Sequence, residues 1–162
     1  TLKGKIWLKS ELGKGTTFYF TIPFIKTEDV VPVSKQSEKT TIKGNRIVLI
    51  AEDDELSYEY LSIILNNQNF EILRAEDGKT AVDICMERND IDIVLMDIKM
   101  PVMNGLSATK LIKERKPKLP IIAQTAYAFS TEKEVAINAG CDDYLTKPVE
   151  KDDLLKVISK YI

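Results

Sequence analysis

The 162-residue sequence contains no histidine, and this absence excludes much of the usual chemistry of enzyme and metal sites. Histidine is the commonest general base near neutral pH and the commonest metal ligand in proteins. A histidine-based catalytic site, a histidine metal site and a phosphohistidine carrier are therefore excluded within these residues.

Cysteines and long apolar runs are also scarce. The two cysteines, Cys85 and Cys141, lie singly in apolar or loop contexts, so we expect reduced structural thiols and no disulfide or metal pair. No apolar run approaches about 18 residues, so the sequence predicts no membrane span. No signal peptide is visible and the first residue is Thr1, so we expect the chain to be part of a longer protein.

The charged residues are unevenly distributed. Residues 1–45 contain eight lysines and four acidic residues, whereas residues 46–162 contain fifteen Lys or Arg and twenty-one acidic residues. An acidic main region argues against direct binding to nucleic acid. The 44% hydrophobic and 30% charged content is typical of a globular domain, and the length suits one domain with a short appendage.

The first 45 residues predict a β-hairpin followed by a linker. Residues 5–9 and 17–22 alternate at period two, residues 12–15 supply a Gly-rich turn, and Pro23 closes the second strand. Residues 26–45 lack periodicity and are mostly polar, as expected of a linker. The apolar residues expected to share faces are Ile6 and Leu8 in the first strand and Phe18, Phe20 and Ile22 in the second.

From residue 46 onward the pattern alternates between strand and helix. Five strands and five helices in strict alternation predict a doubly wound α/β fold, with a parallel sheet and right-handed crossovers. The predicted strands are residues 47–51, 71–75, 91–96, 120–124 and 144–145. The predicted helices are residues 55–67, 79–87, 106–115, 131–139 and 152–161. The first helix repeats Leu56, Tyr60, Ile63 or Ile64, and Leu65 at helical spacing.

Asp97 is the residue around which this region is arranged. It directly follows the apolar run at residues 93–96, which is typical of a strand buried on both faces. Pro101 and the Asn104–Gly105 pair follow as loop and turn residues. The chain thus places a carboxylate at the carboxyl end of a central strand, where open α/β sheets bind ligands.

Polar residues also follow three other predicted strands. Residues 52–54 are Glu-Asp-Asp, Thr125 follows the fourth strand, and Lys147 follows the fifth. Because parallel strands all point one way, these residues should converge near Asp97. Clustered carboxylates repel unless a cation intervenes, and an all-oxygen set suits magnesium. Asp54 alone is better interpreted as a helix cap. An aspartate beside such a cation is a plausible phosphoryl acceptor, with Lys147 and Thr125 holding phosphate oxygens.

Residues 46–162 resemble the receiver (response-regulator) domain throughout their length. The resemblance rests on residues 47–54 (IVLIAEDD), 94–105 (VLMDIKMPVMNG), 121–126 (IIAQTA) and 143–148 (DYLTKP). It implies a flavodoxin-like five-stranded parallel sheet. It also implies that a phosphohistidine-bearing kinase or phosphotransfer domain transfers a phosphoryl group to the central aspartate.

The same resemblance implies a metal site for Mg²⁺ or Mn²⁺. Asp53, Asp97 and the backbone carbonyl of Lys99 would bind the ion directly, and Glu52 would contribute through water. Many receivers have aspartate where this chain has Glu52, and the longer acid is also common in the family.

Further roles are implied around the metal. Lys147 and Thr125 would contact the phosphoryl group, and Thr125 with Tyr144 would form a hydroxyl–aromatic switch. The peptide bond before Pro148 is often cis in such domains. The residues that would support the loops are Pro101, Gly105 and Pro148.

Residues 4–23 resemble the last two strands of a histidine-kinase ATP-binding domain, most specifically in the turn at residues 13–18. The asparagine-bearing and glycine-rich lid motifs of that domain are absent, so this fragment should not bind ATP.

The order of a kinase tail at residues 1–25, a linker and a receiver is that of hybrid sensor kinases. The resemblance therefore implies a cytoplasmic region of an ATP-dependent histidine kinase, either soluble or anchored in the inner membrane. By itself this fragment would only catalyse phosphorylation and dephosphorylation of its own aspartate. We also expect the apolar hairpin to pair with another copy.

Three alternatives remain open at this stage. A magnesium phosphohydrolase would want a second acid just after the nucleophile, where this chain has Ile98 and Lys99. A flavodoxin-like flavin protein would need a phosphate-binding loop where residues 52–54 are acidic. A degenerate receiver that acts only as a scaffold would not need the complete set of site residues.

Overall fold

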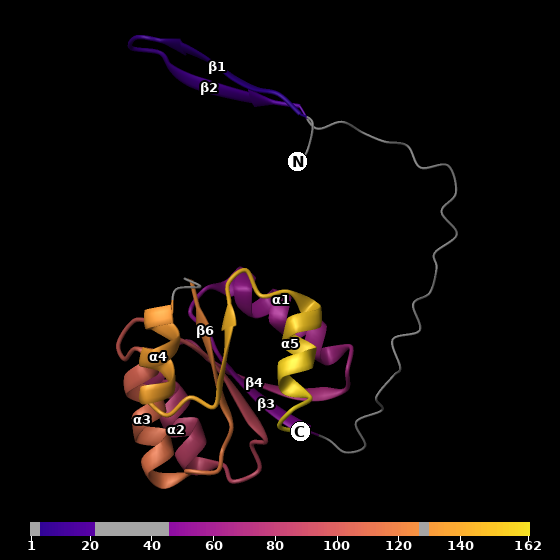
Figure 1. The fold of residues 1–162 in the computed structure, drawn as a ribbon, viewed down its shortest axis with the longest axis vertical. Helices are drawn as coiled ribbons and strands as arrows, with labels where there is room; N and C mark the ends of the chain where they lie inside the picture. Colours follow the sequence, from indigo (N-terminus) through magenta and orange to yellow (C-terminus); the bar gives the residue numbers. More distant parts are fainter. Residues whose placement is uncertain (1–3, 22–45, 127–129) are drawn as a thin grey trace, which may run out of the picture. The chain divides into compact units, whose positions relative to one another are not determined.

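The structure, a computed structural model, describes residues 4–21, 46–126 and 130–162. The predicted linker at residues 26–45, together with Ile22 and Pro23, lies outside the described residues. The chain divides into two units, an N-terminal hairpin and an α/β domain, and each is described by itself (Figure 1).

The hairpin forms as predicted. Strands β1 (Ile6–Glu11) and β2 (Gly15–Phe20) pair antiparallel, and the turn contains Gly13 with a φ of 80°. A positive φ is accessible to glycine without steric cost, so the turn is tight. On one face Trp7 stacks on Tyr19 with ring centroids 5.5 Å apart.

The opposite face of the hairpin is apolar and exposed. Ile6 pairs with Phe20, and Leu8 pairs with Phe18, which puts the four side chains on one face as expected. All four are more than half exposed. Two strands alone cannot bury such a face, so it is available for contact with another surface.

Residues from Arg46 onward form five strands and five helices in alternation. The sheet is wholly parallel with the order β4-β3-β5-β6-β7, so the predicted doubly wound fold is confirmed (Figure 1). In the part of the chain that is described, no helix has the length and apolarity needed to cross a membrane. The strands are β3 (Arg46–Ala51), β4 (Phe70–Ala75), β5 (Ile93–Asp97), β6 (Ile121–Thr125) and β7 (Asp143–Thr146). The helices are α1 (Glu55–Asn66), α2 (Gly78–Glu87), α3 (Gly105–Arg115), α4 (Ser130–Asn138) and α5 (Lys151–Ile158).

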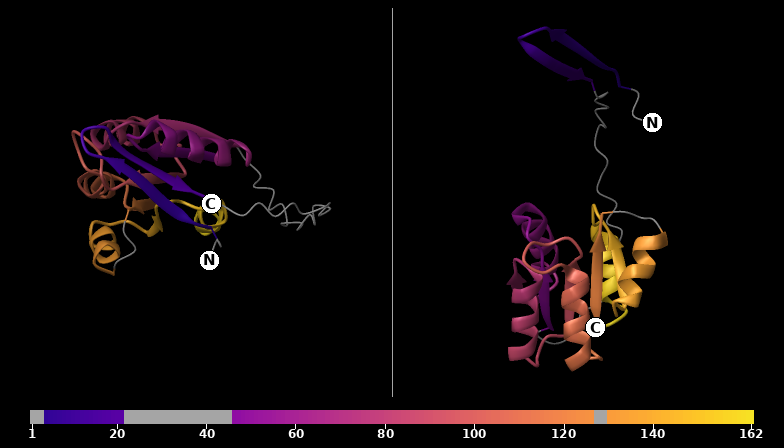
Figure 2. Two further views of the ribbon diagram at one scale, coloured as in Figure 1. Left: turned by 90° about the horizontal axis from the view of Figure 1, so that it is seen from above. Right: turned by 90° about the vertical axis from the view of Figure 1, so that its left-hand side faces the viewer.

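The sheet is covered on both faces. Helices α2, α3 and α4 lie on one face and α1 and α5 on the other (Figures 1 and 2). Strand β5 alternates between the two cores: Val94 and Met96 enter the first, whereas Ile93 and Leu95 enter the second. All four are fully buried, which explains why the strand is a continuous apolar run.

Helix α1 corrects one expectation from the sequence. Its buried residues are Leu61, Ile64 and Leu65, so only two of the residues predicted at helical spacing reach the core. Positions 56, 60 and 63 belong to an overlapping set with the same spacing, and periodicity alone does not say which set faces the sheet. The apolar side chains that α1 leaves exposed are Leu56 (74%), Tyr60 (46%) and Ile63 (62%).

Side-chain caps set where the helices begin. Asp54 accepts a hydrogen bond from the backbone N–H of Ser57 at 2.8 Å, which confirms that it caps α1. Asp77 and Asn104 cap α2 and α3 in the same way. The first cap leaves Asp53 at the turn between β3 and α1.

Gly105 lets the turn before α3 close directly onto β5. A Cβ atom at this position would lie 2.0 Å from the backbone oxygen of Asp97 and 2.9 Å from Cγ of Met96. The backbone N–H of Gly105 also donates to the oxygen of Ile98 at 3.0 Å. The glycine is therefore required by close packing against the strand that carries Asp97.

We predict that Gly105→Ala destabilises the domain by about 3 kcal/mol, because its methyl group would overlap backbone that cannot move cheaply. The free energy of unfolding, measured in urea, checks this value. Ser107→Ala is the matched control, since Ser107 is exposed in the same helix. Equal stability of the two variants would show that the turn has room for a side chain.

Candidate functional site

The predicted site residues converge at the carboxyl ends of the strands. Asp97 ends β5, is 6% exposed, and lies beside the point where the strand order reverses between β3 and β5. Its Oδ1 accepts from the backbone N–H of Lys99 at 3.2 Å, and its Oδ2 accepts from Nζ of Lys147 at 2.8 Å. Ligands of doubly wound folds bind at such reversal points.

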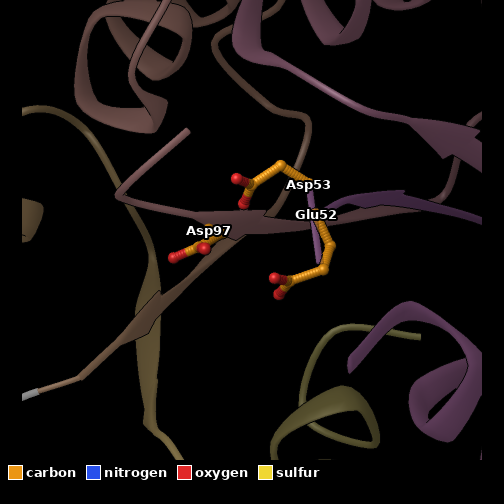
Figure 3. A group of neighbouring side chains, drawn as sticks. All are labelled: Glu52, Asp53 and Asp97. Atoms are coloured by element: carbon orange, nitrogen blue, oxygen red, sulfur yellow. The ribbon is translucent and has the colours of Figure 1, made fainter. Parts of the chain in front are cut away.

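Three carboxylates gather at this point. One oxygen from each of Glu52, Asp53 and Asp97 can be chosen so that all lie within 4.8 Å of one another (Figure 3). Glu52 is fully buried whereas Asp53 is exposed. An all-oxygen group of this kind, partly open to solvent, suits a hard divalent cation that keeps some of its waters.

Lys147 holds two of these acids together. Its Nζ lies 2.6 Å from Oε2 of Glu52 and 2.8 Å from Oδ2 of Asp97. Burial alone would lower the pKa of Lys147, but its hydrogen bonds with Asp97 and Glu52 and the negative charges of these acids together outweigh burial and raise the pKa. Lys147 is therefore a fixed positive charge at neutral pH.

Glu52 shows the opposite balance. Burial raises its pKa, the hydrogen bond from Lys147 opposes that rise, and the nearby charge of Asp97 adds to it. One ammonium group thus faces three carboxylates. This leaves an excess of negative charge that a divalent cation would neutralise. Lys147 contacts one oxygen each of Glu52 and Asp97, so Asp53, which is exposed, is the most accessible of the three acids.

Thr125 and Tyr144 lie on the neighbouring strands β6 and β7. Thr125 ends β6, is 3% exposed and pairs in register with Thr146. Tyr144 is half-buried, and Nζ of Lys133 lies 4.8 Å from the centroid of its ring. Both residues of the predicted switch therefore lie on the side of the site away from Glu52.

The loops around the site agree with the resemblance. Pro101 and Gly105 lie in the segment that follows β5. The Lys147–Pro148 peptide bond is cis, as expected from the resemblance to receiver domains. Val102, next to Pro101, has a φ of 61°, a left-handed conformation that β-branched residues rarely adopt.

The sequence analysis missed one residue at this edge. Gln124 pairs in register with Asp97 and is only 1% exposed. Its signal in the sequence is a single amide side chain at the end of an otherwise apolar strand. Neither its Nε2 nor its Oε1 has a hydrogen-bond partner within the described ranges.

Comparison with known proteins agrees with the geometry. The response regulator receiver domain matches residues 48–159. Hybrid signal transduction histidine kinase I of Dictyostelium discoideum is 39% identical over 123 residues, which cover 71% of this chain and 7% of that protein. The chain spans between 7% and 20% of the length of this and the next two curated relatives.

Solved receiver domains share the fold. One is the receiver domain of a Pseudomonas aeruginosa sensor histidine kinase with a magnesium ion in its active-site cleft. It is 31% identical, with a TM-score of 0.67 over 73% of this chain and 98% of that one.

Another is the receiver domain of the Saccharomyces cerevisiae response regulator Ssk1, in complex with the histidine phosphotransfer protein Ypd1. It is 30% identical, with a TM-score of 0.69 over 72% of this chain and 88% of that one. On the family match, the strand order and the acidic site together, this chain belongs to the response regulator receiver domains of two-component signalling.

Proposed function

We propose that Asp97 accepts a phosphoryl group from a phosphohistidine on a partner protein. The observation that carries this proposal is the pairing of a nearly buried carboxylate with Lys147 at 2.8 Å, inside a group of three acids. An oxygen of Asp97 would attack phosphorus, a P–O bond would form, and the P–N bond to the imidazole would break. The imidazole takes up a proton as it leaves.

The residues around Asp97 supply position and charge. Lys147 would move from its carboxylate partner to an oxygen of the phosphoryl group, because both are anionic acceptors for the same ammonium group. The Thr125 hydroxyl would donate to a second oxygen. Such sites act by positioning and charge neutralisation, since phosphoryl transfer needs little covalent help from the protein.

Magnesium, or manganese in its place, fits the acids of this site. Asp53, Asp97 and the carbonyl of Lys99 would hold the ion, with Glu52 contributing through water, as the resemblance to receiver domains implies. The ion would neutralise charge that develops on the transferred group. The magnesium ion in the related Pseudomonas aeruginosa receiver supports this choice.

Phosphorylation would switch the surface on the β6–β7 side of the site. A phosphoryl group adds acceptor oxygens that draw the Thr125 hydroxyl toward Asp97. The space left behind would admit the ring of Tyr144, which is half-buried in the described conformation. Inward movement of the ring would end its contact with Lys133 and change the surface between α4 and β7.

The exposed face of α1 supports a helical phosphodonor. Leu56, Tyr60 and Ile63 are spaced at i, i+4 and i+7 and are 46–74% exposed, as in helices that pack against a partner helix. The related Ssk1 receiver has been solved with a histidine phosphotransfer protein, which is consistent with a partner of that class.

The parent protein we propose is a hybrid sensor histidine kinase, with this region in the cytoplasm. The relatives with a similar receiver sequence include a hybrid histidine kinase. The hairpin at residues 1–25 would be the end of an ATP-binding domain. The linker at residues 26–45 would connect the two. The ATP-dependent activity would reside outside these residues.

Incubation of the chain with phosphoramidate and magnesium should add the mass of one phosphoryl group, because phosphoramidate offers the P–N bond of a phosphohistidine. We expect Asp97→Asn to abolish the added mass, as measured by intact-protein mass spectrometry. Asp54→Asn is the matched control, since asparagine preserves the helix cap. Full labelling of Asp97→Asn would assign the phosphoryl group to another residue.

Asp53→Ala should remove magnesium binding while the fold is retained. We expect affinity to fall by more than the roughly 10- to 100-fold that loss of an outer partner costs a metal site. Amide shifts during a magnesium titration measure the affinity, again with Asp54→Asn as the control. The metal-free variant should be no less stable than the parent, because carboxylate repulsion is relieved. An unchanged titration would rule out Asp53 as a ligand.

The exposed apolar face of the hairpin supports self-association, and we propose a weak dimer through it. Replacing Phe18 and Phe20 by serine in the full chain should shift the mass in solution to that of a monomer at high protein concentration. Thr17→Lys is the control, since Thr17 lies on the opposite face of the same strand. A parent chain that is itself monomeric at high concentration would contradict the proposal.

A further inference from the structure

Gln124 is a buried amide with no hydrogen-bond partner in the part of the chain that the structure describes. It is 1% exposed, and neither Nε2 nor Oε1 has a partner among the described residues. Buried polar groups are nearly always paired, because each unpaired group loses its bonds to water without replacement. An unpaired amide in a folded protein therefore calls for an explanation, and the space next to it offers one.

Gln124 lines a pocket of about 440 Å³ between α1 and the segment that joins β7 to α5. Leu56, Tyr60 and Leu61 of α1 line one side, and Pro148 and Val149 line the other. Gln124 lines the pocket from β6, a strand of the sheet that α1 covers. The volume falls within the range of small-molecule sites, which are mostly apolar with few polar groups.

The charges around the pocket favour a neutral occupant. Lys147 also lines it, but its ammonium group is already held by Glu52 and Asp97 at 2.6 and 2.8 Å. Glu150 contributes an exposed carboxylate to the rim, which disfavours an anion. Ser57 and Tyr60 add hydroxyl groups to the lining, and Gln124 adds a carboxamide whose donor and acceptor are both buried without a partner among the described residues.

We propose that this pocket binds a small, neutral, mostly apolar ligand that carries an amide group. The N–H and C=O of that amide would pair with Oε1 and Nε2 of Gln124, and its apolar part would contact α1 and Val149. Both atoms of Gln124 are shielded from water, so a ligand reaches them only when side chains that line the pocket move. Leu56 and Tyr60, which are 74% and 46% exposed, are free to do so.

Benzamide is a suitable probe, because it joins one apolar ring to one amide. We expect titration into the ¹⁵N-labelled full chain to shift the Gln124 side-chain NH₂ resonance, identified by its loss in Gln124→Leu, and the amides of Leu56 and Val149. Gln124→Leu should weaken binding about tenfold, as expected for the loss of two neutral hydrogen bonds. Acetophenone, which has the ring and the acceptor but no N–H, should bind the parent chain more weakly than benzamide. Gln124→Leu should weaken the binding of acetophenone less than that of benzamide, because only one hydrogen bond is lost.

Two variants on α1 locate the site. Leu56→Ala should weaken benzamide binding, whereas Ile63→Ala, an exposed residue of the same helix that does not line the pocket, should leave it unchanged. Gln124→Leu should also raise the melting temperature by several degrees, since it removes an unpaired amide. A lower melting temperature would show that the amide is paired in solution and would overturn the proposal.

The remaining outcomes are equally decisive. No shift up to the solubility limit of benzamide, or equal affinity of the parent and Gln124→Leu, would refute the site. Equal binding of benzamide and acetophenone would leave an apolar pocket without amide recognition, contrary to the proposal. If a phosphotransfer protein shifts the Gln124 NH₂ and benzamide does not, the occupant is a partner side chain and the small-ligand proposal fails. The titration contains no phosphodonor, so its outcome does not depend on phosphorylation of the chain.

Discussion

The ammonium group of Lys147, held between Glu52 and Asp97, is the interaction on which the site depends. The two acids are 0% and 6% exposed, and buried carboxylates without a partner would be expelled or protonated. Glu52 and Lys147 are separated by 95 residues, and Asp97 lies between them in the sequence. The parallel sheet assembles this trio because it places the carboxyl ends of β3, β5 and β7 at one edge, so the ion pairs depend on the fold.

Close backbone packing keeps Asp97 in position for that interaction. The strand beneath it is buried between two apolar layers, which prevents the strand from shifting along its axis without exposing its core residues. Behind it, the turn at Gly105 touches the backbone of Asp97 itself, where no side chain fits. Gly78 has a similar contact with the oxygen of Met103, so the loop after β5 is held from both ends. Close packing thus maintains the position of Asp97, whereas Lys147 offsets part of the negative charge.

Most of this arrangement could be predicted from the sequence, because it is revealed by two local signals: apolar runs that end in polar residues, and the alternation of strands with helices. Apolar runs that end in acids, Thr125 or Lys147 identify the strands and their direction, and strict alternation with helices makes the sheet parallel. The face of α1 could not be predicted, because residues 56, 60 and 63 and residues 61, 64 and 65 fit the same period. Which set is buried depends on how the helix packs on the sheet. The lack of a hydrogen-bond partner for Gln124 among the described residues likewise depends on neighbours from other elements. The sequence around Gln124 shows only one amide in an apolar strand.

Strand β6 connects the two sides of the site. Consecutive residues of a strand point to opposite faces, so Gln124 and Thr125 lie on different sides of the sheet although one peptide unit joins them. Gln124 is the register neighbour of Asp97 on the α1 side, whereas Thr125 lies on the side of Tyr144. A hydroxyl drawn toward a phosphorylated Asp97 would therefore move the same short segment of backbone that carries the unpaired amide. Occupancy of the pocket beside α1 and movement of the switch residue would then be coupled through the end of one strand, and thermodynamic linkage requires that coupling to act in both directions.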